Sequence, residues 1–144
     1  MQVEILSHSY EETQLVLKNT NPAFANSLRR IMIAEVPTVA IEAVEITQND
    51  SPLIDEMICH RLGLIPLQSD HIDLVFPQDC DCSQDACDNC AAIYKIDVHN
   101  TTNKPMNIYS KHIMPINSAA HQHLPVFDNV IITTINPNSR LSLT

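Results

Sequence analysis

Four cysteines lie within eleven residues of this 144-residue chain, as the pairs Cys80 and Cys82, and Cys87 and Cys90. Zinc takes four thiolates in a tetrahedral site, and two close pairs joined by a short loop can supply them. From Leu62 to Tyr94 there is no Lys or Arg, whereas Asp recurs, and this charge disfavours a free thiolate. The alternatives to a metal site are a loop with free or disulfide-paired thiols and a thiol-redox site. The sequence predicts one structural zinc ion at these four cysteines, with no open coordination position for hydrolysis.

Composition limits what else the chain can be. Apolar residues make up 44% and charged residues 17%, which is typical of a chain that buries a core, and the aromatic share of 4% predicts an aliphatic core. Eight Lys and Arg against seventeen Asp and Glu give a net charge of -9, which disfavours wrapping nucleic acid and favours a protein partner. The sequence has no long apolar run and no basic segment followed by an apolar one at its start. We therefore expect neither a membrane span nor a secretory signal.

The N-terminal segment predicts a β-hairpin followed by a helix. Residues 3–6 and 13–18 have the composition of two strands, joined by a polar turn at residues 9–12. Asn21, followed by a proline, is a favourable N-cap for a helix, and Pro37 ends the helical pattern.

This first predicted helix has an apolar side and a basic pair. Helical spacing places Phe24, Leu28 and Ile31 along one line. Arg29 and Arg30 are adjacent in sequence and therefore about 100° apart around the helix, so at least one of them leaves the apolar line.

The remainder of the chain predicts strands and one more helix, so the order of elements indicates an α+β fold. Ser51 as N-cap and Pro52 at the first position predict the start of this second helix. Gly63, the only glycine, is expected to close it in a left-handed conformation. Residues 111–128 predict an irregular connection. The expected strands are residues 38–46, 94–98, 106–109 as a partner of the preceding strand, 130–135, and 141–144 as the next strand of a hairpin.

Other candidate features have simpler explanations. His121 and His123 could offer two imidazoles to a metal, but no third ligand is spaced to help them. Asn100 opens a glycosylation sequon, for which a polar turn is the simpler interpretation. Cys59 lies among apolar residues and is interpreted as a small core residue. Since glycine-rich phosphate loops and the common hydrolase motifs are absent from the sequence, enzymatic activity is not predicted.

Two stretches of the chain resemble a known family. Residues 21–41 (NPAFANSLRRIMIAEVPTVAI) resemble the first helix and following strand of α-like RNA polymerase subunits, and residues 55–67 (DEMICHRLGLIPL) resemble the second signature of that family. Within the family, the cysteine loop is similar to that of the third-largest subunit of eukaryotic RNA polymerase II. The loop departs from the family in having four residues between its cysteine pairs where three are more usual.

The resemblance implies an α-like RNA polymerase dimerisation domain, built from the hairpin and first helix and interrupted by an inserted β-rich domain that carries the zinc loop. Residues 1–38 would be the N-terminal part of the dimerisation domain, and residues 39–144 the inserted domain with the zinc loop at residues 80–90. In the family the chain later returns to complete the first domain. We therefore expect a fragment or a split subunit whose inserted domain is incomplete at the C-terminus.

The function that the resemblance implies is assembly. The apolar line of Phe24, Leu28 and Ile31 would pair with a smaller α-like subunit as a heterodimer. Arg29 and Arg30 would face the second-largest subunit, where guanidinium groups can bind carboxylates or carbonyls. The chain would be a non-catalytic subunit of DNA-directed RNA polymerase II that serves transcription in the nucleus, without sequence-specific nucleic acid contact or a membrane.

Other assignments fit the same residues. The equivalent subunit of RNA polymerases I and III, or of archaeal polymerase, is one alternative. A free-standing zinc-binding interaction module would be a stable monomer without polymerase partners, and a thiol-redox protein would have a cysteine of low pKa and no stoichiometric zinc. Two solvated arginines are the alternative for the basic pair.

Overall fold

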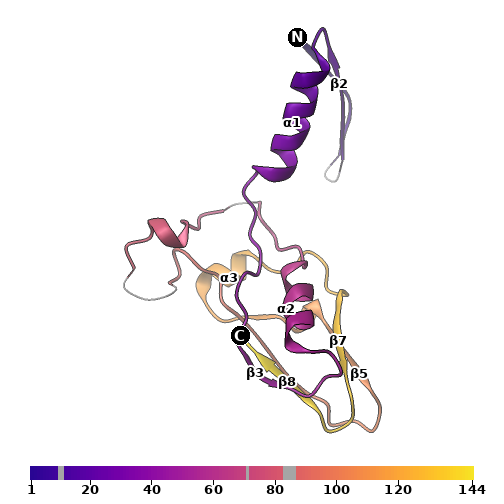
Figure 1. Cartoon of the computed structure of the whole chain (residues 1–144), viewed down its shortest axis with the longest axis vertical. Helices are drawn as coiled ribbons and strands as arrows, with labels where there is room; N and C mark the ends of the chain where they lie inside the picture. The colour runs from indigo at the N-terminus through magenta and orange to yellow at the C-terminus, as the bar shows by residue number, and fades with distance from the viewer. Residues whose placement is uncertain (10–11, 71, 83–86) are drawn as a thin grey trace. The chain divides into compact units, whose positions relative to one another are not determined.

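The computed structural model describes residues 1–9, 12–70, 72–82 and 87–144. The chain divides into two compact units, Met1–Pro37 (unit 1) and Thr38–Thr144 (unit 2). Figure 1 shows the helices and strands of each unit along the chain.

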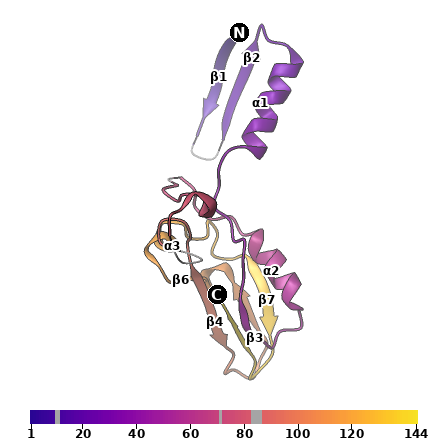
Figure 2. The ribbon, with the colours of Figure 1, turned by 60° about the vertical axis from the view of Figure 1, so that its left-hand side comes forward.

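Unit 1 is a hairpin and a helix. Strands β1 (Gln2–His8) and β2 (Thr13–Lys18) are antiparallel, and helix α1 (Pro22–Ala34) runs alongside them (Figure 2). The Asn21 side chain accepts a hydrogen bond from the Phe24 N–H at 2.7 Å, so the predicted N-cap is confirmed. Both predicted strands are confirmed as well, whereas the predicted turn between them includes residues 10–11, which lie outside the described residues.

Unit 2 contains two antiparallel sheets. The larger has four strands in the order β3-β8-β4-β6, and the smaller pairs β5 with β7. Its elements in chain order are β3 (Ile46–Asn49), α2 (Asp55–Gly63), the short 3-10 helix η1 (Pro77–Asp79), β4 (Tyr94–His99), β5 (Met106–Tyr109), η2 (Ser110–His112), β6 (Met114–Pro115), α3 (Ser118–Gln122), β7 (Ile131–Ile135) and β8 (Arg140–Leu143).

The core of unit 2 is aliphatic, as the low aromatic content predicts. Helix α2 packs against β7 and contributes Ile58 and Leu62, which are 0% and 1% exposed. The other members come from the strands and the segments between them: Ile65, Ile96, Ile108, Ile113, Ile132, Ile135, Leu141 and Leu143. The Arg61 guanidinium donates to the Ile132 carbonyl at 2.8 Å and so ties the end of α2 to β7.

The prediction of a strand over residues 38–46 is wrong except at its last residue. The described structure assigns no strand to residues 38–45, and β3 begins at Ile46. Ile41 and Val44 pack against the core, so their place in the apolar pattern reflects side-chain burial. Glu45, just before β3, exchanges two backbone hydrogen bonds with Thr144 at 2.7 and 2.9 Å.

The predicted start of the second helix and the predicted left-handed conformation of Gly63 are also wrong, although the helix does end at Gly63. The helix begins at Asp55 with Ile54 as N-cap, because the Ser51 hydroxyl accepts from the Leu53 N–H within a preceding turn. Gly63 remains helical, and the chain has no glycine with positive φ. Left-handed backbone occurs at asparagines: Asn19 has a φ of 55° and Asn138 a φ of 59°.

The sequence predicts where the strands form better than it predicts which strands pair. The strands expected near residues 94–98, 106–109, 130–135 and 141–144 are all present. However, β5 pairs with β7 and not with β4, and β8 lies between β3 and β4 and not beside β7. The supposedly irregular residues 111–128 contain β6 and α3 and part of η2, so that prediction is wrong in part.

Candidate functional site

The four cysteines of the loop converge on one point. The Sγ–Sγ distances are 3.7 Å for Cys80 and Cys87, 3.8 Å for Cys82 and Cys90, and 3.6 Å for Cys87 and Cys90. All four sulfurs lie within 4.8 Å of one another. The linking residues 83–86 lie outside the described residues.

This spacing fits a metal ion better than disulfides. Bonded sulfurs would be about 2.05 Å apart. In a tetrahedral site with zinc–sulfur distances of about 2.3 Å, neighbouring sulfurs are about 3.8 Å apart, since the edge of a tetrahedron is about 1.6 times its centre-to-corner distance. The three distances of 3.6–3.8 Å match that edge. The four thiols can therefore hold a metal ion.

Local backbone structure presents the sulfurs. The 3-10 helix η1 precedes Cys80, whose N–H donates to the Pro77 carbonyl at 3.4 Å. The second pair closes a tight turn, in which the N–H groups of Cys90 and Ala91 donate to the Cys87 carbonyl at 3.0 and 2.9 Å. The Cys87 N–H in turn donates to the Cys90 sulfur at 3.3 Å.

The thiols differ in acidity. The backbone N–H of Asn89, followed by the Cys90 thiol, lowers the pKa of Cys87 to about 7. The Cys80 thiol, followed by burial, raises the pKa of Cys82 to about 12. The Cys82 N–H acts to lower the pKa of Cys80, but burial and the thiols of Cys87 and Cys90 raise it overall. The lowered pKa of Cys87 has its main cause in a backbone donor, although the stretch is acidic.

One residue that the sequence did not single out anchors this loop. Asn117, the N-cap of α3, donates through Nδ2 to the Ala91 carbonyl at 2.8 Å. Its Oδ1 accepts from the N–H groups of Ile93 at 2.9 Å and Ala120 at 3.1 Å. An asparagine before a short helix signals an N-cap, but no sequence pattern shows that it also holds a segment 26 residues earlier.

The structure also places the other candidate residues, namely the two histidines, the asparagine of the sequon and the fifth cysteine. His123 is buried, and its Nδ1 lies 2.8 Å from the Gln68 carbonyl, whereas His121 is exposed. Asn100 is 0% exposed, with Nδ2 donating to the Lys104, Ile135 and Asn136 carbonyls. The simple explanation of its sequon as a turn residue is confirmed. Cys59 is half-buried rather than a full core residue.

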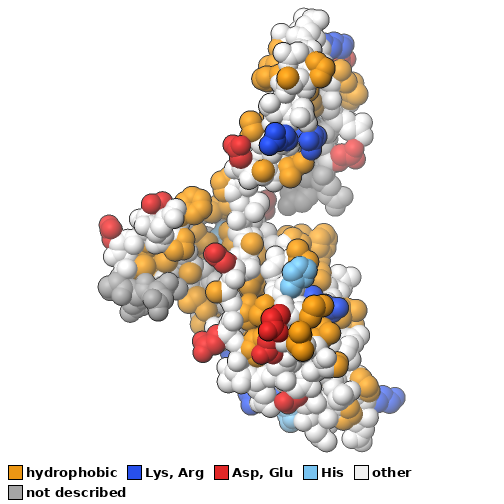
Figure 3. Space-filling model, in the orientation of Figure 1, with side chains coloured by type: hydrophobic (Ala, Val, Ile, Leu, Met, Phe, Trp, Pro, Cys, Tyr) orange, Lys and Arg blue, Asp and Glu red, His pale blue; other side chains and the backbone are white. Residues whose placement is uncertain are grey.

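The residues expected at a subunit interface lie on α1. Phe24 and Ile31 are 44% and 45% exposed, and Leu28 is half-buried. No described residue of unit 1 is buried. Figure 3 shows hydrophobic side chains spread over this unit. Besides Phe24 and Ile31, the exposed large hydrophobic residues of unit 1 include Met1, Val3, Ile5, Leu6, Leu15, Met32, Ile33 and Val36.

The basic pair is exposed on the same helix. Arg29 and Arg30 both face solvent. The Arg29 side chain is held in place by Asn26, whose Oδ1 accepts from Nε at 3.2 Å and from Nη2 at 2.9 Å. Among the hydrogen bonds of the described residues, these two leave the other guanidinium N–H groups of Arg29 available for a further acceptor.

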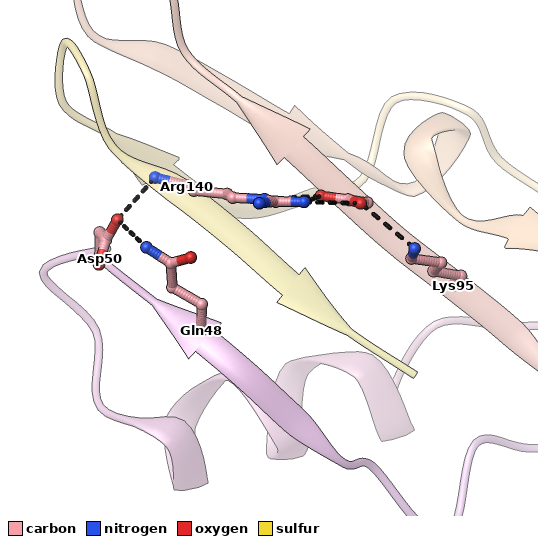
Figure 4. A network of polar contacts seen from close by, with 5 residues as sticks. Gln48, Asp50, Lys95 and Arg140 are labelled. Atoms are coloured by element: carbon pink, nitrogen blue, oxygen red, sulfur yellow. Dashed lines mark hydrogen bonds and ion pairs between the residues drawn. The ribbon is translucent and has the colours of Figure 1, made fainter.

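A polar network crosses the larger sheet (Figure 4). The Arg140 side chain makes a two-pronged contact with Asp97 at 2.9 and 3.0 Å, and Lys95 lies 3.2 Å from the same carboxylate. The Arg140 N–H and the Gln48 amide donate to Asp50 at 2.9 Å each. Arg140 and then Lys95 lower the pKa of Asp97. The network joins three strands, and its charges are matched within it.

A profile of the RNA polymerase Rpb3/Rpb11 dimerisation domain matches residues 14–136 of the chain.

None of the helices in the described part of the chain is long and apolar enough for a membrane span.

Curated relatives agree with this match. DNA-directed RNA polymerase II subunit rpb3 of Dictyostelium discoideum is 45% identical over 130 residues, which are 90% of this chain and 42% of that protein. The RPB3 subunit of Schizosaccharomyces pombe is 39% identical over 127 residues, or 84% of this chain and 42% of that protein. The archaeal subunit Rpo3 of Methanosphaera stadtmanae is 33% identical over 144 residues, or 99% of this chain and 52% of that protein. The chain thus spans about half the length of these relatives.

Proposed function

This chain belongs to the RNA polymerase Rpb3/Rpb11 dimerisation domain family, and from that membership we propose that it is a non-catalytic assembly subunit of DNA-directed RNA polymerase II. In this role it pairs with a smaller α-like subunit and docks the second-largest subunit. It acts in transcription, in the nucleus, and contributes no residue to phosphoryl transfer.

The uncovered apolar surface of unit 1 is the observation that carries this proposal. A hairpin and a helix with no buried described residue cannot be stabilised by a core of their own. Large exposed apolar patches on protein surfaces mark interaction sites. Residues 1–38 are accordingly the N-terminal part of a dimerisation domain, with Phe24, Leu28 and Ile31 facing the smaller subunit.

Arg29 and Arg30 are assigned to the second-largest subunit. Both are exposed, and Asn26 fixes the orientation of the Arg29 guanidinium, so the cost of ordering that side chain in a complex is reduced. An oriented guanidinium can bind a carboxylate through two parallel hydrogen bonds.

Residues 39–144 form the inserted β-rich domain in this proposal, with one structural zinc ion held by Cys80, Cys82, Cys87 and Cys90. Such an ion, bound by four thiolates, supplies a crosslink and no open position for chemistry. The crosslink stabilises a loop to which few core residues belong, because metal binding there is coupled to folding.

An archaeal polymerase is the second candidate setting. The match to Methanosphaera stadtmanae Rpo3 covers 99% of this chain, against 90% for the Dictyostelium discoideum subunit, although identity is lower at 33% against 45%. The higher identity favours polymerase II over the archaeal enzyme.

Affinity purification of the natural protein at moderate salt, followed by mass spectrometry, tests the proposal. We expect the smaller α-like subunit and both large polymerase subunits, whose isoforms would identify the polymerase class. Arg29→Glu with Arg30→Glu should abolish recovery of the second-largest subunit. Lys104→Glu with Lys111→Glu makes the same charge change on exposed residues of unit 2 and should leave recovery unchanged. Undiminished recovery with the arginine variant would remove the docking assignment, and a zinc-loaded chain recovered alone would favour a separate interaction module.

A further inference from the structure

The two halves of the thiol cluster are tied to unit 2 in different ways. Cys80 follows the local turn η1, and its N–H bonds within that turn to Pro77. The Cys87–Cys90 turn is followed at once by Ala91, whose carbonyl accepts from the Asn117 side chain at 2.8 Å. A carbonyl adjacent in sequence to a thiol ligand is thus held by a residue of another element.

Asn117 holds this point through both ends of its amide. Its Nδ2 donates to Ala91, and its Oδ1 accepts from the N–H groups of Ile93 and Ala120. Neighbouring contacts support the same position, since the Ile116 N–H donates to the Ile93 carbonyl at 2.8 Å. The exit of the Cys87–Cys90 turn is therefore fixed to the start of α3.

We propose that Asn117 is a positioning residue of the metal centre, holding the Cys87–Cys90 turn in its metal-binding geometry before the ion arrives. The inference rests on the metal site proposed above. Cys90 is already 7% exposed, and the Cys87 N–H already points to its sulfur at 3.3 Å. A pre-ordered pair loses less conformational freedom when it binds the ion, so affinity rises without any new ligand.

The side chain at this position must donate and accept at once. Asparagine supplies an N–H for the Ala91 carbonyl and an oxygen for the two N–H groups. Aspartate keeps the acceptor, and it remains a good N-cap, but it cannot donate and would face the Ala91 carbonyl with a negative charge. Asn117→Asp therefore separates the capping of α3 from the hold on the cysteine turn.

The test measures zinc affinity of the full chain by competition with a chromophoric chelator at neutral pH. Loss of an outer-shell partner weakens metal binding 10–100-fold in known sites, and we expect about 10-fold for Asn117→Asp because Asn117 acts through backbone. Asn117→Ser, which also retains a capping oxygen but is too short to bridge, provides a neutral second variant should Asn117→Asp fail to fold.

Two controls separate positioning from general stability. Asn107→Asp makes the same chemical change on β5, where the side chain contacts only Tyr109 and Thr134 among the hydrogen bonds described. Asn100→Ala destabilises the fold by removing a buried donor to three carbonyls. Both controls should keep the wild-type zinc affinity. Equal weakening by Asn117→Asp and Asn100→Ala, or wild-type affinity in Asn117→Asp, would overturn the role of Asn117 alone. A wild-type chain that binds no stoichiometric zinc would overturn both this role and the metal site.

Discussion

Truncating the apolar line on α1 should weaken binding to the smaller α-like subunit without unfolding the chain. Phe24 and Ile31 are 44% and 45% exposed, so a little under half of each residue is still available for burial against a partner. Complete burial of a Phe or Ile side chain stabilises by about 1.5–3 kcal/mol, so the remaining part is worth about 1 kcal/mol for each residue.

The two losses should add, because the residues lie about two helical turns, or roughly 10 Å, apart. Phe24→Ala with Ile31→Ala should therefore cost about 2 kcal/mol, which corresponds to about a 30-fold increase in Kd. More than half of each residue is already covered in the isolated chain, so far-UV circular dichroism of the variant is compared with that of the wild type to check that α1 stays helical.

Titration calorimetry with the purified smaller subunit measures this effect, and Ile33→Ala is the matched control. Ile33 is 74% exposed and two positions from Ile31, which places it about 200° around the helix. The control should bind as tightly as the wild type. If the double variant also binds that tightly, the line of Phe24 and Ile31 does not face the smaller subunit.

Three further predictions concern unit 2. Gly63→Ala should be neutral or should stabilise the chain by up to about 1 kcal/mol in urea unfolding. The residue is helical, and the nearest atom to an added Cβ is a backbone oxygen at 3.4 Å. A marked loss of stability would instead indicate left-handed backbone at this residue. Asp97→Asn should destabilise the chain at neutral pH and progressively less in acid. Arg140 and then Lys95 lower the pKa of Asp97 in the folded state. The stability that these contacts contribute is therefore complete above the ordinary Asp pKa of about 3.9 and is lost as the pH falls through the lowered pKa of the folded state. If the difference in urea midpoint between the variant and the wild type did not change with pH, this reasoning would be wrong. Cys87→Ser with Cys90→Ser should lower Tm and zinc content together. The control, Cys59→Ser, should change neither Tm nor zinc content by much. A double variant with unchanged Tm would exclude a structural metal.

Local signals in the sequence predict local structure well. Asn21 supplies a side-chain acceptor just before Pro22, and the helix begins there because both preferences concern neighbouring backbone groups. The thiol cluster is predicted for the same reason. Its members lie within eleven residues, so a short loop is enough to bring their sulfurs together.

Features that depend on distant residues are not visible in the sequence. The single glycine suggested left-handed backbone at residue 63, but Asn19 and Asn138 adopt it, since the short polar side chain of asparagine tolerates that region. Strand β5 pairs with β7, and beside this pair the buried Asn100 amide donates to the carbonyls of Lys104 and Ile135, which lie 31 residues apart in the chain. No periodicity within either strand carries that information.

The two units differ in how they obtain stability, and this difference bears on function. Unit 2 buries a cluster of ten aliphatic residues, whereas the described part of unit 1 buries none. A thirteen-residue helix is marginal by itself in water, so α1 needs a covering surface to persist. Part of the free energy gained when a partner covers α1 then goes into ordering unit 1, and the rest appears as binding affinity. Hydrogen exchange should accordingly slow in α1 when the smaller subunit binds and stay constant in β4 and β8, and strong protection of α1 in the isolated chain would show that unit 1 needs no partner to be ordered.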